Sequence, residues 1–394
     1  MAIATNPVRI AVIGVGGGGC NAVDRMISVD IAGISYVVLN TDGQALAGSE
    51  APTKICLGGP RTRGLGAGGD PSRGAEAAKL SAEQISQALE GMDLVFIAAG
   101  MGGGTGSGAA PVVGDVARSL GALVVAVVTK PFSFEGYRRR QVADEAVKDL
   151  KSHVDTMIVV PNDRLLSFIS DKVTLDVAFR IADDVLRQGI QGISEVITRP
   201  GLINVDFADI RRIMTRGGAS LMSIAQAKGP ERAVEAAQLV IANPLVDGDS
   251  ITGATGVLVN IVGGPDMTLH EAGNAVEHIT ERASQDAEVI FGAAIDNAMG
   301  EKIQITLLAT GLDLEAARAR APEALPRRRV EMAAQRPATI VPREFEQRLA
   351  QLRGRADSAQ PAQSSHEPAP TFPQGGQTNA LDVPSFLRRA RSTL

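Results

Sequence analysis

Two glycine-rich segments each follow a short apolar run and precede a helical pattern. The first is GVGGGG at 14–19, after the run 8–13, and the second is GGGTGSG at 102–108, after the run 93–99. A strand that ends in a glycine turn at a helix start gathers several backbone N–H groups at the positive end of the helix dipole. One such turn suits a diphosphate. Two in one domain predict a longer polyphosphate that is held from both sides.

The first segment taken alone also matches a dinucleotide fingerprint, because Gly14, Gly16 and Gly19 have the spacing GxGxxG after a strand. That fingerprint requires an acidic residue about 20 residues later for the ribose, and the chain has NTD at 40–42. A nicotinamide-dependent enzyme is therefore one alternative, and the second glycine segment argues against it. The sequence contains no GxxxxGK[ST], which excludes an ordinary P-loop.

The composition argues against nucleic acid and membranes as direct partners. The 394 residues, 44% of them hydrophobic, suffice for two domains and a tail. A net charge of −5 and an aromatic content of 3% without tryptophan disfavour nucleic-acid binding. No apolar run approaches the roughly 20 residues of a membrane span, and two cysteines, Cys20 and Cys56, fit a reducing compartment. We expect a cytoplasmic protein with no direct membrane span.

Apolar strands alternate with amphipathic helices over the first part of the chain. Strands are predicted at 8–13, 35–39, 93–99, 122–128 and 156–160, and helices near 21–28, 74–90, 108–119 and 138–152. Continuous apolar strands between helices predict a parallel sheet that is covered on both faces, with ligands at the carboxyl ends of the strands. Both glycine segments fall at such ends. The fold class is α/β, with a Rossmann-like domain over 1–172.

The rest of the chain divides into four further segments. The pattern of residues 173–198 predicts a long central helix, and that of residues 199–315 predicts a smaller α+β domain. That domain has helices at 206–216, 230–242 and 268–283 and strands near 256–262, 287–292 and 303–310. Residues 316–378 have the composition of a disordered linker. Residues 379–394 regain apolar and arginine side chains, which indicates a partner-binding peptide or, alternatively, a disordered end with chance apolar residues.

Several motifs in register resemble the tubulin/FtsZ family of GTPases, and the FtsZ division proteins within it. The segment GGGTGSG resembles the family signature GGGTG[ST]G. With it stand GVGGGGCN at 14–21, TKPF at 129–132, FEG at 134–136, PND at 161–163 and TRPGLINVDFAD at 198–209. The likeness spans residues 8 to about 312, and LDVPSFLRR at 381–389 resembles the family's partner-binding peptide. It implies a GTP-hydrolysing protein that polymerises head to tail into filaments of the cell-division ring.

The resemblance also implies which residues bind GTP. Guanine would stack on Phe179 and donate its N1–H and amino groups to Asp183, one helical turn away. On the residues alone, the pattern favours Phe179 as a core aromatic, and Asp183 is equally well explained as a solvated helix acid. The remaining implied contacts, to base, ribose and phosphates, are Asn21, Glu135, Arg139 and Asn162, and the turn residues Gly17, Gly18, Gly19, Cys20, Gly68, Gly69, Gly102, Gly103, Gly104, Thr105 and Gly106.

Magnesium should arrive with the nucleotide, because no carboxylate constellation in the sequence builds a metal cage. The Thr105 hydroxyl would then donate to a phosphate oxygen or meet the Mg²⁺ ion. Catalysis is implied for Asn204, Asp206 and Asp209, in a loop that one subunit inserts over the next subunit's nucleotide to orient the attacking water. On the residues alone, acids at a helix start are also ordinary caps or dipole partners.

The implied partners are further copies of the chain and membrane-tethered division adaptors that bind residues 379–394, with the protein concentrated at the mid-cell division site. Three positions depart from the family pattern. Asp70 stands where asparagine is common, and Ser223 and Ala225 stand where the family usually has glycine. Asp70 bears on nucleotide affinity, whereas Ser223 and Ala225 keep open a second alternative, an FtsZ-like filament protein that binds GTP with weak or lost turnover.

Overall fold

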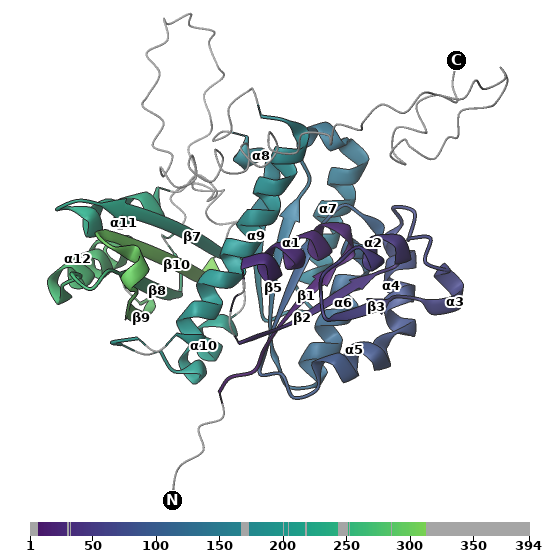
Figure 1. Ribbon diagram of the computed structural model, residues 1–394, viewed down its shortest axis with the longest axis horizontal. Helices are drawn as coiled ribbons and strands as arrows, with labels where there is room; N and C mark the ends of the chain where they lie inside the picture. Colours follow the sequence, from purple (N-terminus) through teal and green to yellow (C-terminus); the bar gives the residue numbers. More distant parts are fainter. Residues whose placement is uncertain are drawn as a thin grey trace, which may run out of the picture. The chain divides into compact units, whose positions relative to one another are not determined.

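A ten-stranded sheet runs through the described part of the chain (Figure 1). The computed structural model describes residues 7–29, 31, 33–166, 173–199, 201–203, 205–216, 219–242, 251, 253–284 and 286–312. The strands are β1 (Ile10–Val15), β2 (Ile34–Asn40), β3 (Thr53–Cys56), β4 (Leu94–Gly100), β5 (Leu123–Lys130), β6 (Thr156–Pro161), β7 (Ala219–Lys228), β8 (Gly256–Gly263), β9 (Glu288–Ile295) and β10 (Lys302–Leu312).

The strand order is β3-β2-β1-β4-β5-β6-β7-β10-β8-β9. Strands β3 to β7 in this order pair in parallel, which confirms the predicted parallel sheet. Strand β10 is antiparallel to both β7 and β8, and β8 is parallel to β9. A short pairing of β6 with β7, at Met157 with Ala219 and Ile158 with Ser220, makes the later strands a continuation of the first sheet.

Twelve α-helices flank the sheet in the described ranges. They are α1 (Gly16–Val29), α2 (Gly43–Ala47), α3 (Gly59–Thr62), α4 (Pro71–Leu80), α5 (Ala82–Leu89), α6 (Gly104–Ser119), α7 (Tyr137–Leu150), α8 (Asn162–Leu165), α9 (Leu175–Thr198), α10 (Phe207–Met214), α11 (Arg232–Ile241) and α12 (Leu269–Thr280). Two 3₁₀ turns, η1 (Ser133–Glu135) and η2 (Asn297–Met299), complete the set. None of these helices is both long and apolar enough to cross a bilayer.

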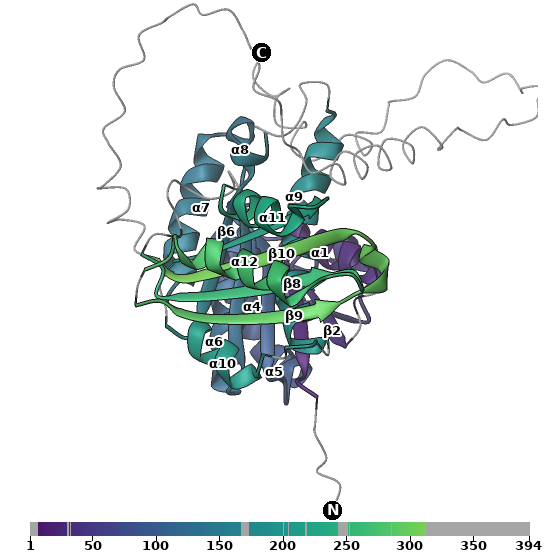
Figure 2. The same ribbon diagram turned by 90° about the vertical axis from the view of Figure 1, so that its left-hand side faces the viewer.

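The two faces of the sheet carry different cores because successive side chains of a strand point in opposite directions. In β1, for example, Ile13 packs with α4, α5, α6 and α7, whereas its neighbour Val12 packs with α1, α9 and α10. The same alternation continues in β8, where Leu258 joins the α9 core and Val257 packs under α11 and α12. Figure 2 looks onto this part of the sheet, with α11 and α12 beside β8, β9 and β10.

Two predicted helix boundaries were wrong in the same way. Helices α1 and α6 begin at Gly16 and Gly104, inside the glycine segments, and not at 21 and 108. Glycine is a poor helix former, so sequence preference places the start too late. The predicted helix 74–90 is in fact two helices, α4 and α5, which meet at Ser81. Ser81 is buried, and its hydroxyl accepts a hydrogen bond from the Gly58 amide at 3.1 Å.

Helix α9, the predicted central helix, packs between the first strands and the later ones. Its residues Leu186, Ile190 and Ile193 are fully buried in the core that also holds β1, β4 and β5. Two glycines bring its backbone close to other strands: a Cβ atom on Gly189 would lie 3.2 Å from Met222 of β7, and one on Gly192 would lie 3.0 Å from Thr306 of β10. The helix therefore holds both groups of strands.

Candidate functional site

The two glycine segments meet at the carboxyl ends of β1 and β4. Gly16 has φ of +72°, and a Cβ atom on it would lie 2.8 Å from the amide nitrogen of Gly106. A Cβ atom on Gly106 would in turn lie 2.5 Å from the carbonyl oxygen of Gly100. Only residues without side chains allow the first turns of α1 and α6 to approach this closely. The positive ends of two helix dipoles are thereby placed side by side.

A third segment, the loop 64–70 before α4, joins them. A Cβ atom on Gly104 would lie 2.8 Å from the amide nitrogen of Asp70, so the start of α6 lies directly against this loop. Gly68 and Gly69 both have positive φ, +64° and +79°. Gly17, Gly18, Gly68 and Gly69 are exposed, whereas Gly102, Gly104 and Gly106 are buried and Gly103 is half-buried. The predicted phosphate-binding turns therefore lie against one another, and we call this group of three glycine segments the backbone cradle.

Side-chain hydroxyls tie these loops together. The Thr105 hydroxyl lies 2.6 Å from the hydroxyl of the buried Thr41, and the Thr41 carbonyl accepts the Gly66 amide at 2.9 Å. Ser107, at a position where the family signature has serine or threonine, accepts the Gly102 amide at 2.8 Å. A hydroxyl at this position thus fixes the second glycine turn, and serine can supply it as well as threonine.

The Asp70 carboxylate is turned toward its own helix. It caps α4 by accepting the Ser72 amide at 2.9 Å and the Ser72 hydroxyl at 2.7 Å. These hydrogen bonds hold the pKa of Asp70 below its usual range, so the carboxylate is ionised at neutral pH. An additional negative charge therefore borders the loop 64–70, where the family more commonly has a neutral amide.

The thiol of Cys20 lies in the core and not at the surface of the glycine turns. The thiol is buried beneath the first turn of α1, with Sγ 3.8 Å from the Leu39 carbonyl oxygen, and burial raises its pKa to about 12. It is consequently a small apolar side chain in the core under the site. Gly19 is buried beside it, and Asn21 is exposed on the same helix.

Glu135, Arg139 and Asn162 come to the same edge of the sheet. Glu135 forms an ion pair with Arg139 at 3.2 Å and accepts the Phe132 amide at 2.8 Å. The Arg139 backbone lies against Gly102, since a Cβ atom there would be 2.6 Å from its carbonyl oxygen. Asn162 is 4% exposed, and its Oδ1 atom has no hydrogen-bond partner in the described structure. A buried, unpaired acceptor of this kind is costly unless a ligand or water donates to it.

Phe179 is not a fully buried core residue, because 38% of it is exposed. It meets the ring of Phe132 edge-on, with centroids 5.6 Å apart and an interplanar angle of 81°. Phe134, which is 55% exposed, lies 6.3 Å from Phe179 and stacks on Phe132. The sequence prediction named one ring at this place and missed that Phe134 lies beside it, although Phe134 stands in the quoted motif FEG.

Asp183 stands on α9, and its nearly buried side chain faces α1, so it is not a solvated helix acid. Its side chain is 13% exposed, and Oδ2 accepts Nε–H of Arg25 at 3.2 Å. Burial raises the pKa of Asp183 to about 6, and the Arg25 charge opposes that rise in part. Arg25 was not predicted to belong to the site. It lies one turn after Asn21 on the same face of α1, but its pairing with Asp183 depends on how α1 packs against α9 and not on local spacing.

The predicted catalytic acids lie at the other end of the sheet. Asp206 is exposed and precedes α10, and its side chain forms no capping hydrogen bond; Asp209 in the first turn is 39% exposed. Asn204 lies outside the described residues. Arg211, two residues after Asp209, donates to the carbonyl oxygens of Asp93 and Gly121, both at 3.3 Å.

These carbonyls stand just before β4 and β5, at the amino ends of the strands. In Figure 1, α10 accordingly lies at one end of α9, and α7 and α8 lie at the opposite end. The seven residues of β4 span about 20 Å. The structure therefore does not bring the acids to the glycine turns of the same chain.

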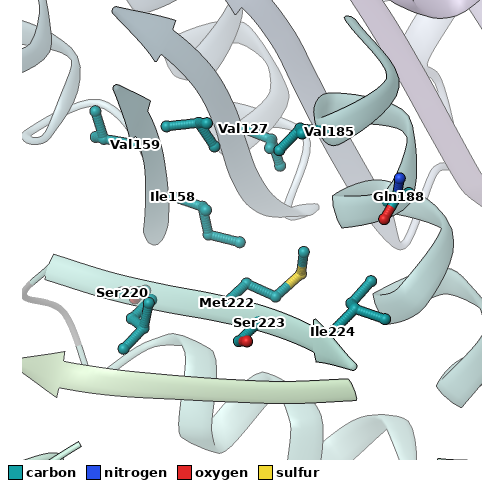
Figure 3. Close-up of a pocket in the computed structure, with 11 residues that line it drawn as sticks. Val127, Ile158, Val159, Val185, Gln188, Ser220, Met222, Ser223 and Ile224 are labelled. Carbon is teal, nitrogen blue, oxygen red and sulfur yellow. The ribbon is translucent and has the colours of Figure 1, made fainter. Parts of the chain in front are cut away.

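A small pocket of about 80 Å³ lies apart from both ends, where β6, β7 and α9 meet (Figure 3). Its lining is mostly aliphatic, with Gln188, Ser220 and Ser223 as the polar members. Ser223 and Ala225 of β7 are 2% and 4% exposed. These two departures from the family pattern are thus inside the fold, whereas the third, Asp70, is exposed. No group of three or more potential metal ligands occurs in the part of the chain that the structure describes.

The geometry defines an α/β nucleotide-binding protein with a backbone cradle for phosphates, and comparisons with known proteins extend this. Residues 9–170 match the model of the tubulin/FtsZ family, GTPase domain, and residues 218–313 match that of the FtsZ family, C-terminal domain. An empty FtsZ dimer from M. jannaschii is 43% identical, with a TM-score of 0.74 over 78% of this chain and 90% of that one. A mutant of M. jannaschii FtsZ is 44% identical, with the same TM-score over 78% and 92%.

The chain belongs to the FtsZ family. It carries that family's GTPase domain, so it binds and hydrolyses GTP, and the alternative of a nicotinamide-dependent enzyme is wrong. CetZ2 from Haloferax volcanii, solved as a protofilament bound to GTPγS, is 20% identical with a TM-score of 0.67 over 80% of this chain and 97% of that chain. At that identity it supports the fold alone.

Proposed function

We propose that this chain is a filament-forming GTPase of the cell-division ring, in which GTP is hydrolysed at the junction between two subunits. The observation that carries the proposal is the separation described above. The backbone cradle lies at the carboxyl ends of β1 and β4, and Asp206 and Asp209 lie beyond the amino ends of the same strands. Acids about 20 Å away cannot act on the nucleotide of their own chain. Head-to-tail stacking would bring them to the next one.

The nucleotide pose follows from the groups at the cradle. The phosphates would accept hydrogen bonds from the backbone amides of the three glycine segments. The base would lie on Phe179, with its two donors directed at Asp183 and with Asn21 as a second contact. Asn162 Oδ1, buried and unpaired, would accept a ribose hydroxyl, and the pair of Glu135 and Arg139 would close the same side.

Magnesium would accompany the nucleotide and keep most of its waters, since hard divalent cations prefer oxygen ligands and dehydrate reluctantly. The Thr105 hydroxyl, held by Thr41, is the protein group placed to meet a phosphate oxygen or the ion. Hydrolysis of a phosphate anhydride depends mainly on positioning and electrostatics. In the proposed junction, Asp206 and Asp209 of one subunit orient and polarise the water that attacks the γ-phosphate held by the other.

The test is turnover as a function of protein concentration. Turnover per molecule should be near zero below a threshold and rise above it, and Asp209→Ala should bind GTP and assemble without turning over. Glu235→Ala is the matched control, because Glu235 is also an exposed acid in the first turn of a helix, α11. Mixing Asp209→Ala with Thr105→Arg should restore some activity, since each contributes one intact half-site. A turnover rate per molecule that is independent of concentration would refute the shared site.

Residues 379–394 lie outside the described residues, and we propose that they bind a membrane-tethered adaptor and so direct the cytoplasmic protein to mid-cell. Leu381, Val383, Phe386 and Leu387 stand among three arginines, a pattern that suits a shallow apolar groove with an acidic rim. Truncation after Gly375 should leave turnover and filament formation intact in solution and abolish recruitment in cells, and Phe386→Ala should reproduce most of the loss. Failure of the truncated protein to assemble when purified would contradict this role.

A further inference from the structure

Residues 205–209, which include Asp206 and Asp209 and are called the acid segment below, lie beside β9, the edge strand of the sheet. Ile203, just before the segment, exchanges two backbone hydrogen bonds with Ala293 of β9, each 3.2 Å long. A Cβ atom on Gly292 would lie 3.1 Å from a methyl group of Val205, so this side chain covers the glycine. One end of the acid segment is therefore attached to β9 by its backbone.

A cluster of four charges attaches the other end to the same strand. Arg212 of α10 lies 3.0 Å from Asp209 Oδ1 through Nη2, and the same guanidinium contacts Glu288, the first residue of β9. Glu288 also pairs with Arg216, which donates to the Thr255 carbonyl oxygen at 3.0 Å. Two cations and two anions alternate in this cluster, so its formal charge sums to zero.

We infer that Arg212 and Glu288 are positioning residues for the Asp209 carboxylate; the inference rests on the shared-site function proposed above. An exposed aspartate at a helix start samples several rotamers, and Asp209 is 39% exposed. Arg212 limits these by binding one carboxylate oxygen. Glu288, at 24% exposure the most buried of the four, contacts the same Nη2 atom of Arg212 and shares its charge. Asp209 is thus held on the edge of the sheet without becoming the sole partner of a cation.

The alternative is that the cluster is an ordinary surface salt bridge. Such pairs contribute little to stability, and their loss would not change catalysis. The position of the cluster argues against this alternative. The cluster attaches the end of the acid segment at Asp209, and the backbone pairing of Ile203 attaches the other end. Both attachments use β9, so a rigid strand sets where the segment stands.

The test measures GTP affinity, sedimented filament and turnover per assembled subunit in the full chain. Arg212→Gln and Glu288→Gln should each lower turnover about 3- to 10-fold, with GTP affinity and sedimentation unchanged. Arg212→Lys, which retains a cation but not the planar, rigid guanidinium, should recover part of the loss. Arg118→Gln is the matched control: Arg118 is a half-exposed arginine paired with Asp155 at 3.6 Å on another part of the surface, and turnover should not change.

A double-mutant comparison separates this inference from the function on which it rests. In an Asp209→Asn background, Arg212→Gln should have no further effect on the residual turnover, because its action passes through that carboxylate. If Asp209→Ala abolishes turnover while Arg212→Gln retains the wild-type rate, the positioning role is wrong and the shared site stands. If Asp209→Ala turns over normally, the proposed function itself fails. An equal loss from Arg212→Gln in both backgrounds would also overturn the inference.

Discussion

The carboxyl group of Asp183 should make nucleotide affinity depend on pH. Burial raises its pKa to about 6 in the empty protein, and in the proposed pose the carboxylate must be ionised to accept both guanine donors. With a pKa of 6, about nine-tenths of the molecules are ionised at pH 7 and about one-tenth at pH 5. The affinity for GTP should accordingly fall about tenfold over this interval, which corresponds to about 1.4 kcal/mol.

The substitution Asp183→Asn isolates this effect. The variant should lose about 1–3 kcal/mol of GTP affinity at pH 7, because an amide cannot accept from both donors and leaves a buried polar group mismatched. It should also gain relative affinity for XTP, whose base carries a carbonyl where guanine has its amino group. The phosphates of the nucleotide titrate in the same pH range, so the informative quantity is the ratio of wild-type to variant affinity. That ratio should shrink as the pH falls below 6.

The same group affects the stability of the empty protein with the opposite sign. A carboxyl whose folded pKa is raised above its unfolded value of 3.8 destabilises the fold as the pH rises from about 4 to 6. The cost at pH 7 is about 3 kcal/mol, so Asp183→Asn should stabilise the empty protein while it weakens GTP binding. Titration calorimetry and chemical denaturation at pH 5, 6 and 7 measure the two effects. An affinity ratio that does not vary with pH, or a variant less stable than wild type, would refute the reasoning.

Three further outcomes are expected from the burial and pairing of other polar side chains. Asn162→Leu should stabilise the empty protein in denaturation and weaken GTP binding by about 1–2 kcal/mol, because it removes an unpaired acceptor that the ribose would use; unchanged GTP affinity would place the ribose elsewhere. Hydrogen bonds from Arg232 lower the pKa of Glu271 to about 2. The ionised carboxylate therefore stabilises the fold fully above about pH 4.5, and this contribution of about 2–3 kcal/mol is lost as the pH falls toward 2. Glu271→Gln should remove that component at pH 7 and flatten the acid limb in thermal melts, and an unaltered limb would assign acid unfolding to other groups. Cys56 is exposed and should react with iodoacetamide at pH 8, whereas Cys20 should not, as peptide mapping by mass spectrometry would show; labelling of Cys20 in the folded protein would contradict its burial.

Much of the sheet could be predicted because its strands carry uninterrupted apolar sequences. The runs at β1, β4 and β5 lie within one or two residues of the observed strands, and both glycine segments fall at carboxyl ends as expected. Strand β3 was missed because TKIC is short and carries a charged residue. The pairing of β6 with β7 could not be foreseen, since it joins strands that are separated in sequence by the whole of α9.

The site was predictable where a motif is local and not where a partner comes from afar. Phe179 and Asp183 stand one turn apart, so their common face follows from helix geometry. Arg25 reaches Asp183 across 158 residues, and no spacing rule links them. The pairing of Arg212 with Glu288 is of the same kind, because it depends on where β9 lies in the sheet. The roles of the nucleotide-contacting and catalytic residues stay predictions until the experiments above are done.

The placement of the acids and the phosphate cradle at opposite ends of the parallel strands has an arithmetic consequence for a filament. Under the proposed mechanism, a row of n subunits contains n − 1 complete sites. At one end a subunit holds GTP with no acids over it, and at the other a subunit presents acids with no nucleotide beneath them. A dimer then has half the activity per chain of a long polymer, and short filaments are slower per subunit than long ones. The two tips also differ chemically, so growth and nucleotide exchange have a built-in direction even though every subunit is identical.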